Sequence, residues 1–272
     1  MKVIDFHTHI FPEKIASRAI GKLEKNSGLS AFTDGTLDGL LQSMKRSGVD
    51  LSVVLPVVTS LKQFQKVNEY AAKMNKEQKH LISFGGIHPQ SQNWQEELSY
   101  IKELGLKGVK IHPDYQETYV DTEEMVAIVQ YAIDLGLHVV FHSGVDVGFP
   151  NPVHCTPKRA RALLGKLHRT AETKGQIIFA HTGAHEMWDD VEKYLVGQDV
   201  YFDLAFNLGR IPDEQLKRII NKQGADRILF ATDSPWDGQK EDIAYLEQMN
   251  LPHEIKEAIF YQNGERLLQK EI

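Results

Sequence analysis

Two histidines separated by one residue, His7 and His9, follow a short apolar run near the beginning of the chain. Side chains of a β-strand alternate between its two faces, so this spacing turns both imidazole rings to the same side. Two neighbouring imidazoles can hold one metal ion, although an isolated pair of this kind can equally be a solvated surface pair. The spacing therefore predicts half of a metal site.

Three further polar residues stand just beyond apolar, strand-like runs. They are His142, His181 and Asp233. Imidazole nitrogens and carboxylate oxygens are common ligands of catalytic zinc, and four strand ends that carry them are hard to explain by chance. This recurrence favours a functional site over a set of unrelated surface residues.

Eight apolar runs alternate with longer segments of helical apolar spacing, as in Leu37, Leu40, Leu41 and Met44. The runs are residues 3–6, 51–57, 81–86, 108–111, 137–141, 176–180, 200–204 and 227–231. This count predicts an α/β fold, a single (β/α)₈ TIM barrel, whose chemistry collects at the C-terminal ends of the strands. An open doubly wound sheet would give the same alternation, but its Gly-x-Gly-x-x-Gly turn does not follow the first run.

Local signals also predict helix ends. Gly48, Gly105 and Gly136 precede strand-like runs, where a left-handed glycine commonly ends a helix. Asp121 precedes an acidic helical segment and is predicted to be its N-cap, with Glu124 completing a capping box.

Composition sets limits on the class of protein. The 272 residues contain no linker-like stretch, so one domain over residues 1–272 is expected. A formal charge of −6 argues against nucleic acid as a partner, and no apolar run is long enough to predict a membrane span. Polar residues interrupt the first ten positions, so no signal peptide is expected. The single cysteine, Cys155, fits a reducing compartment, and we expect a cytoplasmic protein.

Six motifs, in this order, make the chain similar to a known family. They are DFHTH at residues 5–9, GVKIHP at 108–113, FHSG at 141–144, AHTG at 180–183, ATDSP at 231–235 and NGERLL at 263–268. The sequence resembles the amidohydrolase superfamily, within it the amidohydrolase-related (amidohydrolase 2 type) branch of metal-dependent hydrolases and decarboxylases. The resemblance runs the length of the chain.

The resemblance implies a catalytic metal site with an open position for water. The ion would be Zn²⁺, with Mn²⁺ as the second choice, and one metal is expected rather than two. Its ligands would be His7, His9, His142 and Asp233, with Asp233 also able to accept a proton from the water. His181 would polarise or protonate the substrate, or else only support a ligand.

Other residues near the strand ends are predicted to bind substrate: Lys110, His112, His88 and Trp236. For Lys110 two alternatives stay open, a carboxylated ligand of a second metal and a buried structural lysine. Asp5 shares the strand face of His7 and His9, so it either orients a ligand histidine or is a buried acid held by backbone donors.

The function predicted first is a metal-dependent hydrolase that acts on an amide, ester or lactone bond of a small polar molecule. The alternative is a non-oxidative decarboxylase of a small carboxylic acid, and a third hypothesis is a non-catalytic metal-binding barrel. Residues 10–36 and 144–157 are expected to form much of the pocket wall. The sequence leaves the substrate open, and relatives often pair, which leaves a homodimer open too.

Overall fold

Parallel strands alternate with helices throughout the part of the chain that this computed structural model describes, residues 1–149 and 152–272. The strands are β1 (Ile4–Thr8), β2 (Leu51–Val54), β3 (Leu81–Ser83), β4 (Gly85–Gly86), β5 (Gly108–Ile111), β6 (His138–Phe141), β7 (Ile177–Phe179), β8 (Tyr201–Asp203) and β9 (Ile228–Leu229). Each lies within or next to one of the eight predicted runs. Phe84 divides the third run into β3 and β4, which follow one another directly.

Hydrogen bonds join the strands into a closed barrel. One group pairs in the order β1-β2-β3 and the other in the order β4-β5-β6-β7-β8-β9, all in parallel. The ring closes between the first and last strands, where Phe6 N donates to Phe230 O at 2.9 Å and Thr8 forms a parallel bridge with Ser234. The predicted (β/α)₈ barrel is confirmed.

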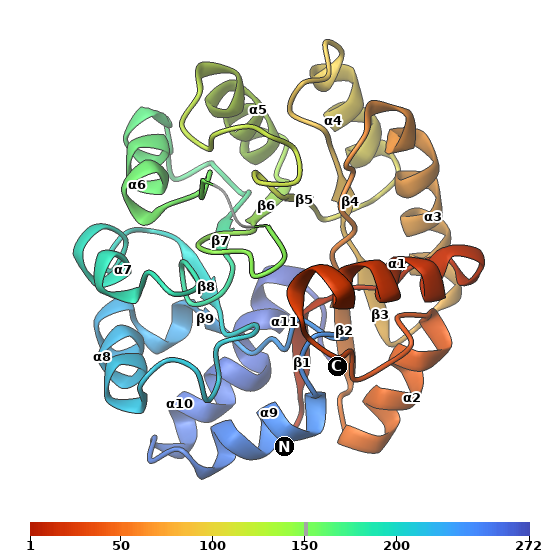
Figure 1. Cartoon of the computed structure of the whole chain (residues 1–272). Helices are drawn as coiled ribbons and strands as arrows, with labels where there is room; N and C mark the ends of the chain where they lie inside the picture. The colour runs from red at the N-terminus through yellow and green to blue at the C-terminus, as the bar shows by residue number, and fades with distance from the viewer. Residues whose placement is uncertain (150–151) are drawn as a thin grey trace.

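Helices surround these strands, most of them in an outer ring (Figure 1). They are α1 (Glu13–Ser27), α2 (Leu37–Ser47), α3 (Phe64–Glu77), α4 (Trp94–Glu103), α5 (Glu123–Asp134), α6 (Pro157–Lys166), α7 (Trp188–Tyr194), α8 (Asp213–Gln223), α9 (Gln239–Gln248), α10 (His253–Glu257) and α11 (Asn263–Leu268). Short 3₁₀ turns at Leu61–Gln63 and Ala225–Arg227 and a π-turn at Ala258–Gln262 complete the helical structure. None of the described helices is both long and apolar enough to cross a membrane.

The glycine signals for helix ends are confirmed, and the predicted N-cap is not. Gly48, Gly105 and Gly136 have φ angles of 75°, 76° and 76°, in the left-handed region that glycine adopts without strain. The N-cap of α5 is Thr122, whose hydroxyl accepts from Met125 N at 3.2 Å. Asp121 was the wrong choice by one residue, because its carboxylate forms an ion pair with Arg159 at 2.7 Å instead.

The two segments predicted as pocket wall meet over one end of the barrel. Gly148, in the loop after β6, lies next to Ser27, the last residue of α1. A Cβ atom added to Gly148 would be 3.8 Å from Ser27 Cβ. In Figure 1 α1 crosses in front of the strands, whereas the other long helices stand around them. The part of the predicted wall at positions 150–151 lies outside the described residues.

A candidate metal centre at the mouth of the barrel

The strand β1 and the loop after β9 bring three donor atoms together. His7 Nε2 lies 3.1 Å from His9 Nε2, and Asp233 Oδ1 lies 3.2 Å and 3.0 Å from these two nitrogens. Main-chain bonds fix this arrangement, since Asp233 N donates to His7 O at 2.9 Å. Asp233 also has a φ of 67°, an uncommon conformation for a non-glycine residue. The geometry allows His7, His9 and Asp233 to hold one metal ion together.

The outward nitrogens of the two histidines show which ring atoms carry protons. His7 Nδ1 lies 2.9 Å from Asp203 Oδ2, and His9 Nδ1 lies 2.8 Å from Leu55 O. Because both partners only accept, each Nδ1 must donate and each Nε2 must present a lone pair. Two lone pairs and a carboxylate therefore converge, and a cation is what satisfies them. The donor set fits a divalent metal of the zinc type.

Lys110, at the end of β5, lies beside these donors. Its Nζ is 3.1 Å from His7 Nε2, and only 1% of the residue is exposed. Burial lowers the pKa of this amine to about 8, against the opposing effect of Asp203 and Asp233. The contact lets the Lys110 ammonium donate to His7 Nε2, and carboxylation of this lysine stays a prediction. Its predicted contact with substrate stays a prediction.

His142 and His181 form a second, adjacent pair. His142 Nδ1 lies 3.0 Å from His181 Nε2, and His181 Nδ1 faces Ala205 O at 3.0 Å. The rings of His7 and His181 have centroids 5.3 Å apart, so this pair borders the first group. The structure does not gather all four predicted ligands within 4.8 Å, since His142 belongs to a separate group with His112 and Asp146.

Burial sets the charge of the site. It lowers the pKa of His7, His142 and His181, so these imidazoles are neutral at pH 7, as metal ligands must be. Burial would raise the pKa of the Asp233 carboxyl, but His7 and His9 lower it by more, and the carboxylate is ionised. The side chains of His9 and Asp233 are 17% and 13% exposed, against 1% for His7. Solvent therefore reaches the centre from the side of His9 and Asp233.

Asp203, which was not among the residues predicted from the sequence, holds two site histidines in place. This fully buried residue ends β8; one carboxylate oxygen faces His7 Nδ1, and the other accepts from His181 N at 2.9 Å. The signal was present, because Asp203 holds the same strand-end position as the predicted ligands. Asp5 is a buried acid, the second of the two roles considered for it. It accepts from the main-chain nitrogens of His7 and Thr232 and from the side chains of Thr232 and Gln239, and from no ligand ring.

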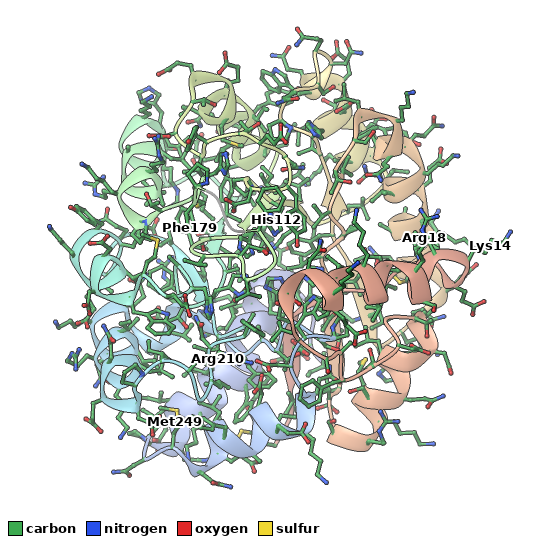
Figure 2. The ribbon with its side chains drawn as sticks, in the orientation of Figure 1. Lys14, Arg18, His112, Phe179, Arg210 and Met249 are labelled. Atoms are coloured by element: carbon green, nitrogen blue, oxygen red, sulfur yellow. The ribbon has the colours of Figure 1, made fainter. Side chains whose placement is uncertain are left out.

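The residues predicted to bind substrate are distributed over three loops. Figure 2 shows His112 near the centre of the ring of helices, and its ring stacks on Tyr115 at 3.8 Å and on His142 at 4.0 Å. His88 is buried and accepts from Gln90 N within its own loop. Trp236 is half-buried, and its backbone N donates to Asp233 O. The structure places His112 at the site, and substrate binding by all three stays a prediction.

Comparisons with known proteins agree with this geometry. A family model described as an amidohydrolase matches residues 4–270. The chain belongs to this amidohydrolase family. None of the curated proteins compared with it matches.

Solved structures share the fold of this amidohydrolase over its whole length. An uncharacterised TIM-barrel protein from Bordetella bronchiseptica matches with a TM-score of 0.75 and 18% identity, and the match covers 99% of each chain. 5-Carboxyvanillate decarboxylase from Sphingomonas paucimobilis matches with 0.72 and 12% over 99% of each chain. A dihydroxybenzoic acid decarboxylase from Polaromonas, solved with bound manganese and 2-nitroresorcinol, matches with 0.71 and 15%, covering 98% of this chain and 97% of that one. The predicted family and barrel are thus confirmed for this amidohydrolase.

Proposed function

We propose that this protein is a metal-dependent hydrolase that adds water to an amide, ester or lactone bond of a small polar molecule. The observation that carries the proposal is the position of Asp233. Its Oδ1 atom borders both Nε2 lone pairs of the His7 and His9 pair, and its side chain is partly open to solvent. One carboxylate is therefore next to the ion site and next to the route by which water enters.

The donor set at the barrel mouth suits zinc, with manganese as the second choice. An ion held there would supply Lewis acidity and lower the pKa of a water molecule to about 7. Asp233 would accept the proton at Oδ2, the oxygen that is not directed at the two Nε2 atoms, and return it to the leaving group. Asp203 and Leu55 O would keep the Nε2 lone pairs of His7 and His9 directed inward throughout.

His181 is proposed to act on the substrate from its position beside the His7 ring. Its Nδ1–H is held by Ala205 O, so Nε2 presents a lone pair towards His142. As a neutral imidazole it can orient a substrate hydrogen or join the donor set, and it cannot donate a proton from Nε2 in this tautomer. The role of proton donor considered for His181 therefore requires that Nε2 also be protonated, which makes the ring an imidazolium.

Non-oxidative decarboxylation of an aromatic acid is the second candidate. The observation that favours it is a wall of nearly parallel rings, in which Tyr115, His112 and His142 lie 9° and 10° from parallel. Phe149 extends this wall, with its ring centroid 5.5 Å from that of Tyr115. A flat aromatic substrate would match these surfaces. Two of the structurally similar proteins are decarboxylases of aromatic acids.

One experiment separates these functions. The protein is stripped with a chelator, reconstituted with zinc or manganese, and assayed in ¹⁸O-water against lactones, esters, amides and aromatic acids. Hydrolysis places ¹⁸O in the product, whereas loss of CO₂ without label in the product indicates the decarboxylase. A metal-loaded protein that turns over no compound of any class would contradict both.

The Asp233→Asn variant tests the role of the carboxylate. It should fold and lose turnover by about 10²-fold to 10⁴-fold, because the proton acceptor is gone. Asp199→Asn is the matched control: Asp199 is exposed and pairs with Arg169 and Arg227, outside the centre, so the turnover of this variant should equal that of the wild type. Near-normal turnover in Asp233→Asn would remove Asp233 from the mechanism.

A further inference from the structure

Four histidines surround the centre: His7, His9, His142 and His181. In three of them the ring nitrogen that points away from the centre is hydrogen-bonded to an oxygen atom. For His7, His9 and His181 this nitrogen lies 2.9, 2.8 and 3.0 Å from its partner. Such partners fix the tautomer and the orientation of a metal-binding imidazole. His142 is the exception, because its Nε2 is buried and has no hydrogen-bond partner among the described residues.

A carboxylate stands close to this nitrogen. Asp146, in the loop after β6, has its Oδ2 atom 4.0 Å from His142 Nε2 and 3.2 Å from His112 Nε2. Its other oxygen, Oδ1, accepts from Gly148 N at 2.8 Å. The carboxylate is therefore held by the main chain at one oxygen, while the second oxygen faces two imidazoles.

The two tautomers of His142 have different consequences. If Nδ1 carries the proton, it donates to the lone pair of His181 Nε2, and the bare Nε2 faces the Asp146 carboxylate without a donor between them. If Nε2 carries the proton, Asp146 Oδ2 can accept it once the two atoms approach by about 1 Å from their present separation of 4.0 Å. The lone pairs of His142 Nδ1 and His181 Nε2 then face each other at 3.0 Å, which requires a cation.

We propose that Asp146 is a positioning residue that accepts a hydrogen bond from His142 Nε2 when metal is bound, and thereby selects the metal-binding tautomer of His142. The inference rests on the proposed function, because it assumes that the centre holds an ion. Metal binding would then shorten the distance between Asp146 Oδ2 and His142 Nε2, and this oxygen would be shared between His142 and His112. The sequence does not show this, since Asp146 lies in an irregular loop.

A metal ion between His112, His142 and Asp146 is the rival explanation of the same three residues, whose donor atoms all lie within 4.8 Å of one another. The ring geometry favours the hydrogen bond. The rings of His112 and His142 are stacked 4.0 Å apart and only 10° from parallel. In-plane lone pairs of parallel rings do not converge on a single point, so one ion cannot bind both rings without separating them.

Two variants and one spectrum test the proposal. In Asp146→Asn the amide oxygen stays on Gly148 N, so the NH₂ group faces His142 and cannot accept from it. Zinc affinity, measured by competition with a chromogenic chelator, should fall by about 10-fold to 100-fold. In His112→Phe the stacking remains while the competing nitrogen is gone, so zinc affinity should equal or exceed that of the wild type. ¹⁵N–¹H spectra of wild-type histidines should show a proton on His142 Nε2 in the zinc form and on Nδ1 in the apo form.

Each outcome decides the proposal. Weaker zinc binding in Asp146→Asn alone, together with the change of tautomer in the wild type, supports it. If Asp146→Asn folds and binds zinc as tightly as the wild type does, the proposal is overturned. If that variant does not fold, the proposal is overturned when His142 of the wild type has the same tautomer with and without zinc. A second equivalent of zinc that both variants lose overturns it in favour of the metal site. A wild-type protein that binds no zinc or manganese overturns the proposed function as well.

Discussion

Replacement of Asp203 by Asn tests whether the orientation of His7 controls metal binding. The substitution changes one atom at a fully buried position at the end of β8. The amide oxygen of Asn can keep the bonds that Asp203 Oδ1 accepts from His181 N at 2.9 Å and Ala205 N at 3.2 Å. The NH₂ group then takes the place of Oδ2, 2.9 Å from His7 Nδ1. Two donors meet there unless His7 changes its tautomer.

The change of tautomer is costly only for the metal-bound protein. With a lone pair on Nδ1, His7 must carry its proton on Nε2, where the ion needs a lone pair. A hydrogen bond to a charged group contributes about 1.5–3 kcal/mol, and tenfold in affinity is about 1.4 kcal/mol. Zinc affinity should therefore fall by about 10-fold to 100-fold. Burial raises the pKa of Asp203, so loss of its charge also relieves a desolvation cost, and the free energy of unfolding of the apo-protein should change by less than about 1 kcal/mol.

The assay compares zinc affinity, by chelator competition, with the free energy of unfolding of the apo-protein in urea. Asp199→Asn is again the control, since this exposed residue pairs with Arg169 and Arg227, which belong to no part of the centre, and should leave zinc affinity unchanged. Zinc affinity within about threefold of the wild type in Asp203→Asn would refute the reasoning. So would an apo-protein destabilised as strongly as the metal-bound form, because Asp203 would then be a general structural residue.

Two further predictions follow from buried charges. Burial lowers the pKa of Lys110 to about 8, so below pH 8 its ammonium competes with a cation beside His7. Zinc affinity should rise with pH up to about 8 and then level, and Lys110→Met should flatten this profile; an equal slope in both proteins would exclude the lysine. Burial raises the pKa of the Asp242 carboxyl to about 9, and the charges of Asp237 and Asp5 add to this effect. The protonated carboxyl therefore contributes to stability below pH 4, and this contribution is lost as the pH rises towards 9. Asp242→Asn should raise the free energy of unfolding at pH 8 by on the order of 3 kcal/mol, measured in urea, and no gain at pH 8 relative to pH 4 would contradict this.

The barrel was predictable from sequence because its strands are buried on both faces and read as continuous apolar runs. Their bounds were less accurate, since residues such as Pro56 and Val57 continue the apolar run beyond the last paired residue of β2. Local cap chemistry was also ambiguous, because Asp121 and Thr122 are both good N-caps, and the choice depends on Arg159, which is distant in sequence.

The sequence predicted which residues lie at the strand ends that form the candidate site. It did not predict which atoms of these residues contact one another. Spacing alone placed His7 and His9 on one face, and strand ends indicated His142, His181 and Asp233. The rotation of each imidazole decides which nitrogen faces the centre, and no sequence pattern reports it. The group that includes His142 and Asp146 therefore appears only in the structure.

Closure of the barrel has a consequence for how long the protein survives. His9 and Asp233 are 224 residues apart in sequence and follow β1 and β9, the two strands that complete the ring. An ion held between them would have to leave before these strands could separate. Ligands that bind only the native state stabilise it in proportion to the logarithm of their free concentration. Cellular metal supply would then govern the turnover of this protein by proteases, and metal starvation would lower its abundance as well as its activity.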